Sequence, residues 1–193
     1  MAEEMVQNAM RGIPWAQSCE LEVRVRLPRR QPLDRDTAWR IFRGCTRDVA
    51  KVTTAHYVDV FTADGIRTRA PLDNSGKAHD MQFCRKNVLQ QSNRVCHGLE
   101  LRLRYSSEVS TLPPTTAPVR RVRLSKRRST TRGSWRIDFT TLYEGVSLAE
   151  AKAAHLRYEV EFEYTGDEQS VSSAGAELDS WLRYALGSGT PVW

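Results

Sequence analysis

The fold is decided by one stretch near the C-terminal end of the chain, Arg157-Tyr158-Glu159-Val160-Glu161-Phe162-Glu163-Tyr164. Acidic and apolar residues alternate along it with a period of two. Successive side chains of a β-strand point to opposite faces, so a strand here has a row of glutamates on one face and an apolar row on the other. An ordinary half-buried strand would turn the acidic row towards water.

A second stretch, residues 19–27, has the same arrangement. Glu20 and Glu22 share a face with Arg24 and Arg26, and leucines and valines occupy the other face. If the two strands meet in space, up to five carboxylates converge. Bound cations would be needed to keep them all ionised.

The chain is predicted to be a single domain over residues 1–193, because no internal repeat or long linker divides it. Residues 1–17 are predicted to form a helical or irregular lead-in, and 167–187 an amphipathic helix on the outside of a sheet. A net charge of +6 allows a polyanionic partner. No apolar run is long enough to cross a bilayer, so no membrane partner is expected.

About eight strands with one charged face each are predicted, and they are hard to arrange as an open sheet. Cationic and anionic rows would crowd one side, while the apolar side would need cover. A closed antiparallel barrel places the charged faces in a polar lumen, with helices around 36–47 and 170–186 covering the apolar exterior. The predicted fold class is therefore mainly β (α+β), a closed eight-stranded antiparallel barrel with flanking helices. Further strands are predicted at 51–62, 66–69, 81–86, 94–105, 120–128 and 135–140.

The charged lumen predicts phosphoanhydride chemistry. Carboxylates without nearby His or Cys suit the hard cations Mg²⁺ or Mn²⁺. A metal facing guanidinium groups would polarise a terminal phosphoryl group and align water for in-line attack. The alternative is a solvated ladder of cross-strand ion pairs. Basic side chains suited to a triphosphate are Arg67, Lys86, Arg94, Arg123, Arg127 and Arg136.

Cysteine and histidine are assigned no chemistry. The four cysteines are far apart and form no CxxC pair, which argues against a zinc knuckle, and they are predicted to fill core or strand positions. The four histidines are scattered, and each is predicted to be structural because it lacks an orienting partner in the sequence.

Three motifs resemble the metal-dependent RNA 5′-triphosphatases of fungi and protozoa, within the triphosphate tunnel metalloenzymes. Glu20-Leu21-Glu22-Val23-Arg24 is similar to the first family motif, ExEx(K/R), and Glu159-Val160-Glu161-Phe162-Glu163 to the last, ExExE. Between them, Arg136-Ile137-Asp138-Phe139-Thr140 resembles the RxDxT strand. The motifs occur in the family's order and span most of the chain.

The resemblance implies an eight-stranded tunnel that removes the γ-phosphate from the 5′ end of nascent mRNA, the first step of cap formation. It implies Mg²⁺ or Mn²⁺ as cofactor, with Glu20, Glu22 and Glu163 as metal ligands. Nucleoside triphosphates are expected as further substrates with manganese, a guanylyltransferase as partner, and the nucleus as location. Glu100, six residues after Arg94, is similar to the glutamate that orients the attacking water. The other implied catalytic residues are Glu159, Glu161, Arg136, Asp138 and Thr140, and the implied phosphate-binding residues are Arg24, Arg67, Lys86, Arg94, Arg123, Lys126 and Arg127.

The basic strand departs from the family pattern RxKxR and fits it in two registers. Alternation turns Arg123 and Arg127 inward, whereas matching the family lysine would select Lys126 and Arg128. We favour the first register, because alternation is a physical constraint on a strand, although a bulge would reverse it.

Two other functions remain open. One is a different tunnel metalloenzyme, of the inorganic polyphosphatase or thiamine triphosphatase type, which the RxDxT strand and the Pro-rich segment at 111–118 argue against. The other is a non-catalytic barrel that binds RNA. Such a module usually presents aromatic stacking platforms, but most aromatic residues here fall on the faces opposite the charges.

Overall fold

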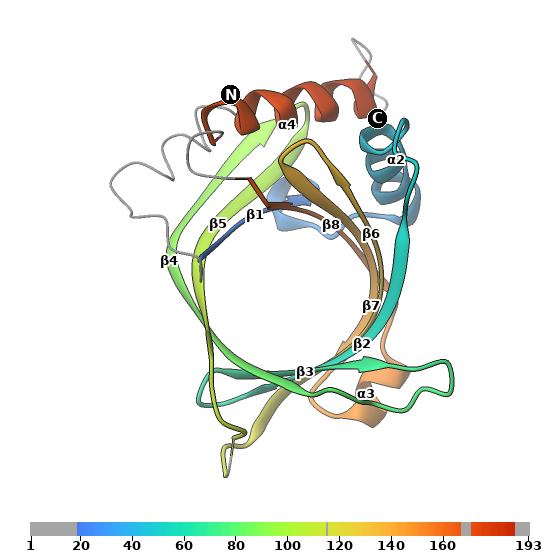
Figure 1. Ribbon diagram of the computed structural model, residues 1–193. Helices are drawn as coiled ribbons and strands as arrows, with labels where there is room; N and C mark the ends of the chain where they lie inside the picture. The colour runs from blue at the N-terminus through green and yellow to red at the C-terminus, as the bar shows by residue number, and fades with distance from the viewer. Residues whose placement is uncertain (1–18, 115, 167–170, 188–193) are drawn as a thin grey trace.

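The computed structural model describes residues 19–114, 116–166 and 171–187. The described chain forms a closed antiparallel barrel of eight strands (Figure 1). The predicted lead-in at 1–17 lies outside the described residues. The strands are β1 (Cys19–Arg26), β2 (Thr53–Thr62), β3 (Ile66–Leu72), β4 (Gln82–Cys96), β5 (Leu99–Ser110), β6 (Val119–Arg132), β7 (Trp135–Gly145) and β8 (Arg157–Tyr164).

The strand order around the barrel is β1-β5-β4-β3-β2-β6-β7-β8, and β1 closes the ring by pairing with β8. The two glutamate-bearing strands are therefore neighbours, although more than a hundred residues separate them in sequence. In their antiparallel register Glu22 lies directly opposite Glu163, and Arg24 lies opposite Glu161. The predicted meeting of the two acidic strands is confirmed.

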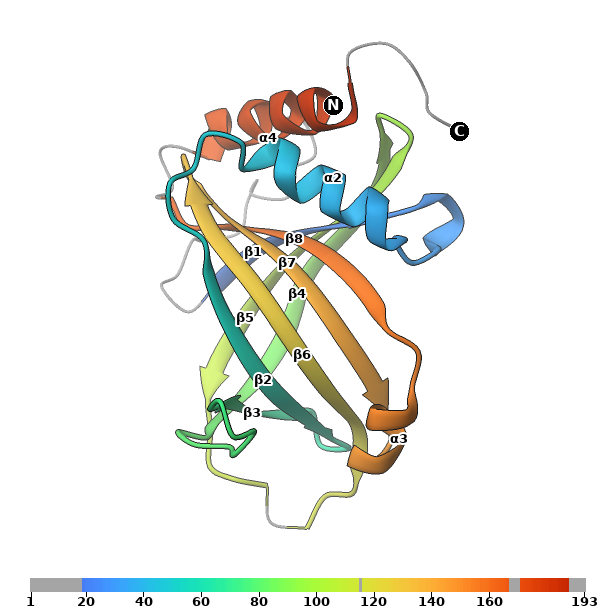
Figure 2. The same ribbon diagram turned by 90° about the vertical axis from the view of Figure 1, so that its right-hand side faces the viewer.

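The apolar core lies outside the barrel wall. The outward residues of β1, β5, β7 and β8 pack against α2 (Arg35–Cys45) and α4 (Val171–Leu186), which cross one side of the barrel (Figure 2). Leu21, Leu101 and Phe162 are fully buried in this layer. Residues 167–170 of the predicted C-terminal helix lie outside the described residues. As predicted, helices cover the apolar exterior and the charged faces line the lumen.

Sequence-encoded caps fix the helix starts. Asp34 accepts a hydrogen bond from the backbone N–H of Thr37 at the N-terminus of α2. Ser147 caps α3 (Leu148–Ala153) in the same way by accepting from the backbone N–H of Glu150, and the Glu150 side chain accepts from the backbone N–H of Val146. A short 3-10 helix, η1 (Pro28–Arg30), follows β1. No helix in the described part of the chain is long and apolar enough to cross a membrane.

The helices α2 and α4 cross at Gly44. A Cβ at this position would lie 2.5 Å from Cα and Cβ of Ala185, so glycine is needed for the two backbones to approach. Ile41 of α2 and Leu182 of α4 are buried in the same apolar core.

One predicted strand, 94–105, is wrong. The chain turns back at His97 and Gly98, so Arg94 lies near the end of β4 whereas Glu100 lies near the start of β5. Both turn residues have positive φ, 51° and 76°, as in the two-residue turns that match the twist of a hairpin. The sequence gives no clear signal for this turn, because the apolar alternation of β5 begins immediately after His97 and Gly98.

Candidate active site

The inward faces of the strands line a cavity of about 600 Å³. Its lining holds twelve basic and nine acidic side chains, so positive charges exceed negative charges by three. This excess favours an anionic ligand of several charges. The acidic residues of the lining are Glu20, Glu22, Asp59, Glu108, Asp138, Glu144, Glu159, Glu161 and Glu163.

The acidic end of the cavity is formed by Glu20, Glu22 and Glu163. Lys86 lies over it, with Nζ 2.7 Å from Glu20 and 3.5 Å from Glu22. Arg136 contacts Glu163. Burial raises the pKa of Glu163 to about 7, and the neighbouring Glu20 and Asp138 add to this rise while Arg136 opposes it. The carboxyl is therefore partly protonated near neutral pH unless a further cation is bound.

The donor set at the acidic end fits a hard divalent cation. All three side chains are carboxylates, and Oε1 of Glu22 is buried without a hydrogen-bond partner among the described residues. The side chains are not yet gathered around one point. Among the described residues, three metal-ligating side chains have ligand atoms within 4.8 Å of one another at a different place, on the outside of the barrel: Cys96, His97 and Asp179. Glu20, Glu22 and Glu163 do not form such a group, so binding one ion would bring their carboxylates closer together.

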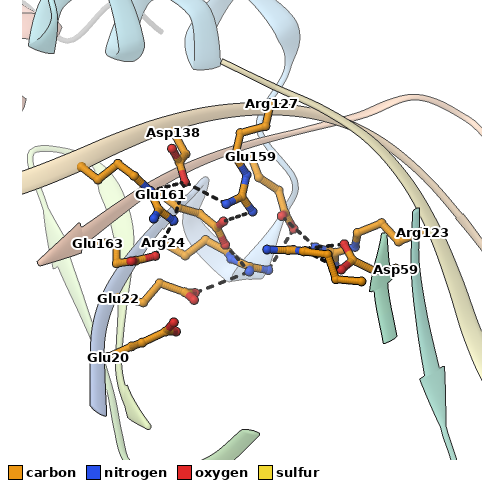
Figure 3. A network of polar contacts seen from close by, with 12 residues as sticks. Glu20, Glu22, Arg24, Asp59, Arg123, Arg127, Asp138, Glu159, Glu161 and Glu163 are labelled. Atoms are coloured by element: carbon orange, nitrogen blue, oxygen red, sulfur yellow. Dashed lines mark hydrogen bonds and ion pairs between the residues drawn. The ribbon is translucent and has the colours of Figure 1, made fainter. Parts of the chain in front are cut away.

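A network of ion pairs fills the middle of the cavity (Figure 3). Arg24 contacts three glutamates, with Nη1 2.9 Å from Glu159 and Nη2 3.4 Å from Glu22, as well as a close contact with Glu161. Arg127 lies 3.1 Å from Asp138. The network holds its side chains in fixed positions, so the ligand meets a pre-organised wall.

Further ion pairs extend this network. Arg123 lies 3.1 Å from Glu144 and 3.4 Å from Glu159. On the neighbouring strands β2 and β3, Nε and Nη2 of Arg69 donate hydrogen bonds to the two carboxylate oxygens of buried Asp59, at 2.7 and 3.1 Å. Arg69 and Arg123 thus pair with acids while still lining the cavity.

Glu161 is held as an anion. Burial opposes its charged form, but the guanidiniums of Arg24 and Arg127 outweigh this effect and hold the pKa of that carboxyl well below its usual range. Arg24 in turn stays protonated, because the glutamates around it outweigh its own burial and raise its pKa. Two carboxylates of the same strand, Glu161 and Glu163, therefore have opposite pKa shifts.

A cationic wall of Arg26, Arg102 and Arg104 lies on β1 and β5. None of the three has a carboxylate within ion-pair distance among the described residues, although Arg104 donates a hydrogen bond to Gln91 at 3.1 Å. Burial lowers the pKa of Arg102 to about 10, with further lowering by Arg24, Arg104 and Arg26. A bound anion would relieve this repulsion. Sequence reasoning did not assign these residues to the site, although alternation places Arg102 and Arg104 opposite the apolar face.

Most of the predicted site residues share the cavity. Arg123 and Arg127 line it, whereas Lys126 is exposed on the outer wall, so the register favoured by alternation is the one that the structure shows. Thr140 lies on the inward side of β7, fully buried next to Asp138, and does not reach the cavity lining. The predicted residues in the lining are Glu20, Glu22, Arg24, Arg67, Lys86, Arg123, Arg127, Arg136, Asp138, Glu159, Glu161 and Glu163.

Arg94 and Glu100 are placed elsewhere than the predicted site. A bulge between Val88 and Gln90 shifts the alternation of β4, so Arg94 pairs with the outward Leu101 and is exposed. Glu100 lies at the end of β5, where its Oε2 accepts a hydrogen bond from the backbone N–H of Arg30 at 3.3 Å. Neither residue lines the cavity.

Glu108 is the glutamate of β5 that faces the cavity. Its Oε2 accepts a hydrogen bond from Arg67 at 3.1 Å, and Lys86 lies 3.4 Å from Oε1. Oε1 is buried without a hydrogen-bond partner among the described residues. The sequence prediction ended this strand at Tyr105, because two serines interrupt the apolar alternation before Glu108.

A closed eight-stranded barrel with a bore lined by carboxylates and guanidiniums defines the triphosphate tunnel fold, and the chain has this fold. No protein-family model and no curated protein matches the sequence. Solved structures do match. S. pombe Pct1 RNA triphosphatase has a TM-score of 0.62 at 13% identity, over 95% of this chain and 86% of its own.

The Mimivirus capping enzyme triphosphatase also matches with a TM-score of 0.62, at 15% identity, over 93% of this chain and 94% of its own. Pct1 in complex with the Spt5 CTD gives 0.60 at 12% identity, over 94% and 86%. These structures are RNA triphosphatases of the tunnel fold. Identities this low establish the shared fold, and activity has to be argued from the site.

Proposed function

We propose that the protein is a metal-dependent RNA 5′-triphosphatase that hydrolyses the γ-phosphate of 5′-triphosphate-ended nascent mRNA, the first step of cap formation. The observation that carries this proposal is the pairing of Glu22 with Glu163 in an enclosed bore whose remaining wall is rich in guanidinium groups. The negative charges of a triphosphate suit the guanidinium wall, and a divalent cation would balance the negative charges of the glutamates.

The reaction is the hydrolysis of a phosphoanhydride, in which a water oxygen bonds to the γ-phosphorus and the bridging P–O bond breaks. A divalent cation, Mg²⁺ or Mn²⁺, held by Glu20, Glu22 and Glu163 would neutralise charge on the terminal phosphoryl group. Arg123, Arg127 and the cationic wall hold the phosphates.

Glu108 replaces Glu100 as the candidate that orients the attacking water. Its Oε1 faces the cavity without a hydrogen-bond partner among the described residues, so it can accept a hydrogen bond from water. Arg67 and Lys86 hold its carboxylate in place. Glu159 and Glu161 act indirectly, by fixing the positions of Arg24, Arg123 and Arg127.

RNA is the favoured substrate because the matching structures named above are RNA triphosphatases. Free nucleoside triphosphates are proposed as secondary substrates with manganese. A nuclear location and a guanylyltransferase partner follow from the capping role alone. A non-catalytic RNA-binding barrel is disfavoured, because Phe61 is the sole aromatic side chain in the cavity lining drawn from the described residues.

The test is release of labelled γ-phosphate from 5′-triphosphate RNA, compared with tripolyphosphate and ATP, with and without Mg²⁺ or Mn²⁺. We expect metal-dependent release that is most efficient with RNA and is lost in Glu163→Gln. Glu100→Gln, which alters a carboxylate outside the cavity, is the matched control and should retain activity. Preference for tripolyphosphate would support the other tunnel enzymes, and RNA binding without turnover would overturn the enzymatic proposal.

A further inference from the structure

A second cluster of metal-ligating side chains lies on the outside of the barrel, between the β4–β5 hairpin and helix α4. It consists of Cys96, the last residue of β4, His97 in the hairpin turn, and Asp179 on α4. Their ligand atoms lie within 4.8 Å of one another. This cluster is separate from the cavity, whose lining includes none of the three residues.

Two of the three separations between the ligand atoms lie close to the edge lengths of a tetrahedral zinc site, and the third is within 4.8 Å. Zn–S bonds are about 2.3 Å and Zn–N and Zn–O bonds about 2.0–2.2 Å, so tetrahedral angles put neighbouring ligand atoms about 3.3–3.6 Å apart. Oδ1 of Asp179 lies 3.3 Å from Sγ of Cys96 and 3.2 Å from Nε2 of His97. These separations are also typical of hydrogen bonds. The arrangement of the three side chains has to decide between a hydrogen-bonded cluster and a metal site.

Three features of the arrangement favour a cation. First, Sγ and Nε2 converge on the same oxygen, Oδ1, from adjacent residues of the hairpin. Second, the β4 bulge turns Cys96 outward, to the face of the barrel on which α4 carries Asp179. Third, the other carboxylate oxygen of Asp179, Oδ2, accepts a hydrogen bond from Arg183 at 3.0 Å. Metal-ligating carboxylates are commonly oriented by hydrogen bonds of this kind from residues that do not touch the metal.

The burial of the cluster also suits a bound metal. Cys96 is 2% exposed, whereas the side chains of His97 and Asp179 are 21% and 17% exposed. The site is therefore enclosed on the thiol side and open to solvent on the other side, where water can supply a fourth ligand. The charge of Arg183 opposes cation binding weakly, because that side chain is 65% exposed and its charge is screened.

We propose that Cys96, His97 and Asp179 bind one Zn²⁺ ion, with water as the fourth ligand. On binding, the S–H bond of Cys96 breaks, its proton passes to solvent, and the thiolate sulfur bonds to the metal. A thiolate, an imidazole and a carboxylate select zinc over the hard cations suited to the cavity. The ion joins the β4–β5 hairpin to α4 and thereby stabilises the helix on the barrel.

The test uses the metal-free full-length protein and Co²⁺ as a spectroscopic substitute for Zn²⁺. We expect a thiolate-to-cobalt charge-transfer absorption that saturates at one equivalent and disappears when zinc is added. The carboxylate end of the cavity has no thiolate, so cobalt bound there gives no such absorption. We also expect zinc at about a hundredfold excess over its dissociation constant to raise Tm by at least about 5 °C.

Variants test whether the absorption and the rise in Tm come from this site. Cys96→Ser should abolish the absorption and the zinc-dependent rise in Tm, whereas the control Cys84→Ser should retain both. Asp179→Asn and His97→Asn should weaken cobalt binding at least about tenfold, and asparagine tolerates the positive φ of the turn. Circular dichroism confirms that each variant is folded, and Asp179→Asn on the helix tests the site even if Cys96→Ser is unfolded.

Three results would overturn the proposal: no thiolate absorption in the wild-type protein, absorption that persists in Cys96→Ser, or an equal Tm shift by zinc in the wild type and a folded Cys96→Ser or Asp179→Asn variant. None of these readouts measures phosphate release, so the zinc site is tested independently of the triphosphatase proposal.

Discussion

Glu22 and Glu163 lie directly opposite each other on the neighbouring antiparallel strands β1 and β8. Two carboxylates in this position repel each other, and such pairs destabilise a sheet unless a proton or a cation intervenes. Arg136 contacts Glu163, and Arg24 and Lys86 lie 3.4 and 3.5 Å from Glu22, yet burial still raises the pKa of Glu163 to about 7. The pair is therefore short of positive charge in the metal-free protein.

This shortage predicts that the metal-free protein loses stability as the pH rises. The folded pKa of Glu163, about 7, is above its ordinary value of 4.5, so the folded state holds an extra proton between these two pKa values. The free energy of unfolding should fall by on the order of 2 kcal/mol as the pH rises through this window. Urea denaturation in EDTA at about pH 5 and about pH 8 measures the fall.

Glu163→Gln should remove most of this pH dependence, because its amide carries no charge at either pH. Adding Mg²⁺ to the wild-type protein should also remove it, by supplying the missing positive charge. An unchanged pH dependence in Glu163→Gln would show that other groups cause it.

Glu108 and Glu100 provide a test of the water-orienting role. Glu108→Gln should lower kcat about 100-fold with little change in KM, because it alters a group expected to act on water and not on the phosphates. Glu100→Gln should remain within about twofold of the wild type, because Glu100 lies outside the cavity. Steady-state kinetics of γ-phosphate release distinguishes the two residues, and the opposite pattern would restore Glu100 to the site.

The register of β6 predicts different roles for two neighbouring residues. Arg127→Ala should abolish detectable activity and lower stability by about 3 kcal/mol, because it leaves the buried Asp138 without one of its two arginine partners. Lys126→Ala, on the exposed outer wall, should leave both nearly unchanged. Activity and thermal denaturation of the two variants would reveal a shifted register if Lys126→Ala were the more damaging.

The cationic wall predicts opposite effects on binding and stability. Arg102→Gln should weaken tripolyphosphate binding about tenfold, the loss expected for one charge-assisted hydrogen bond. The same change should stabilise the unliganded protein, because it removes a half-buried cation that has no acidic partner within ion-pair distance among the described residues. Calorimetric titration and thermal denaturation measure the two effects, with Arg128→Gln on the outer wall as control. A variant that was both less stable and weaker in binding would indicate a purely structural role.

Gly44 predicts a purely structural defect. Gly44→Ala places a methyl group 2.5 Å from Ala185, so the two helices must separate, at a cost of about 1–3 kcal/mol. Phosphate release per folded molecule should be unchanged, because α2 and α4 touch only the outer face of the wall. Tm and kcat measured on the same preparation check the prediction, and a fall in kcat without a fall in Tm would contradict it.

Strict alternation made most of the site predictable from the sequence. It gave the inward faces of β1, β6, β7 and β8, and with them the acidic end and the choice of Arg127 over Lys126. It failed on β4, where one extra residue near Leu89 reverses the faces and turns Arg94 outward. A single-residue bulge leaves no periodic trace in a strand that is polar on both sides. Glu108 was missed for a related reason, since two serines hide the continuation of β5.

The zinc-ligand cluster was also beyond sequence reasoning. Cys96 and His97 are adjacent, but Asp179 lies some eighty residues further along, and only the packing of α4 on the hairpin brings it near. Because Asp179 is distant in sequence, His97 has no visible partner in the sequence and is predicted there to be structural.

The apolar layer outside the wall separates what holds the molecule together from what acts on substrate. Leu21 and Glu22 are neighbours in the chain, yet one is sealed beneath the helices and the other faces the bore. Substitutions of the charged residues that line the bore can therefore accumulate without disturbing the hydrophobic core. A lineage built on this plan could exchange one polyphosphate substrate for another while its architecture stayed constant.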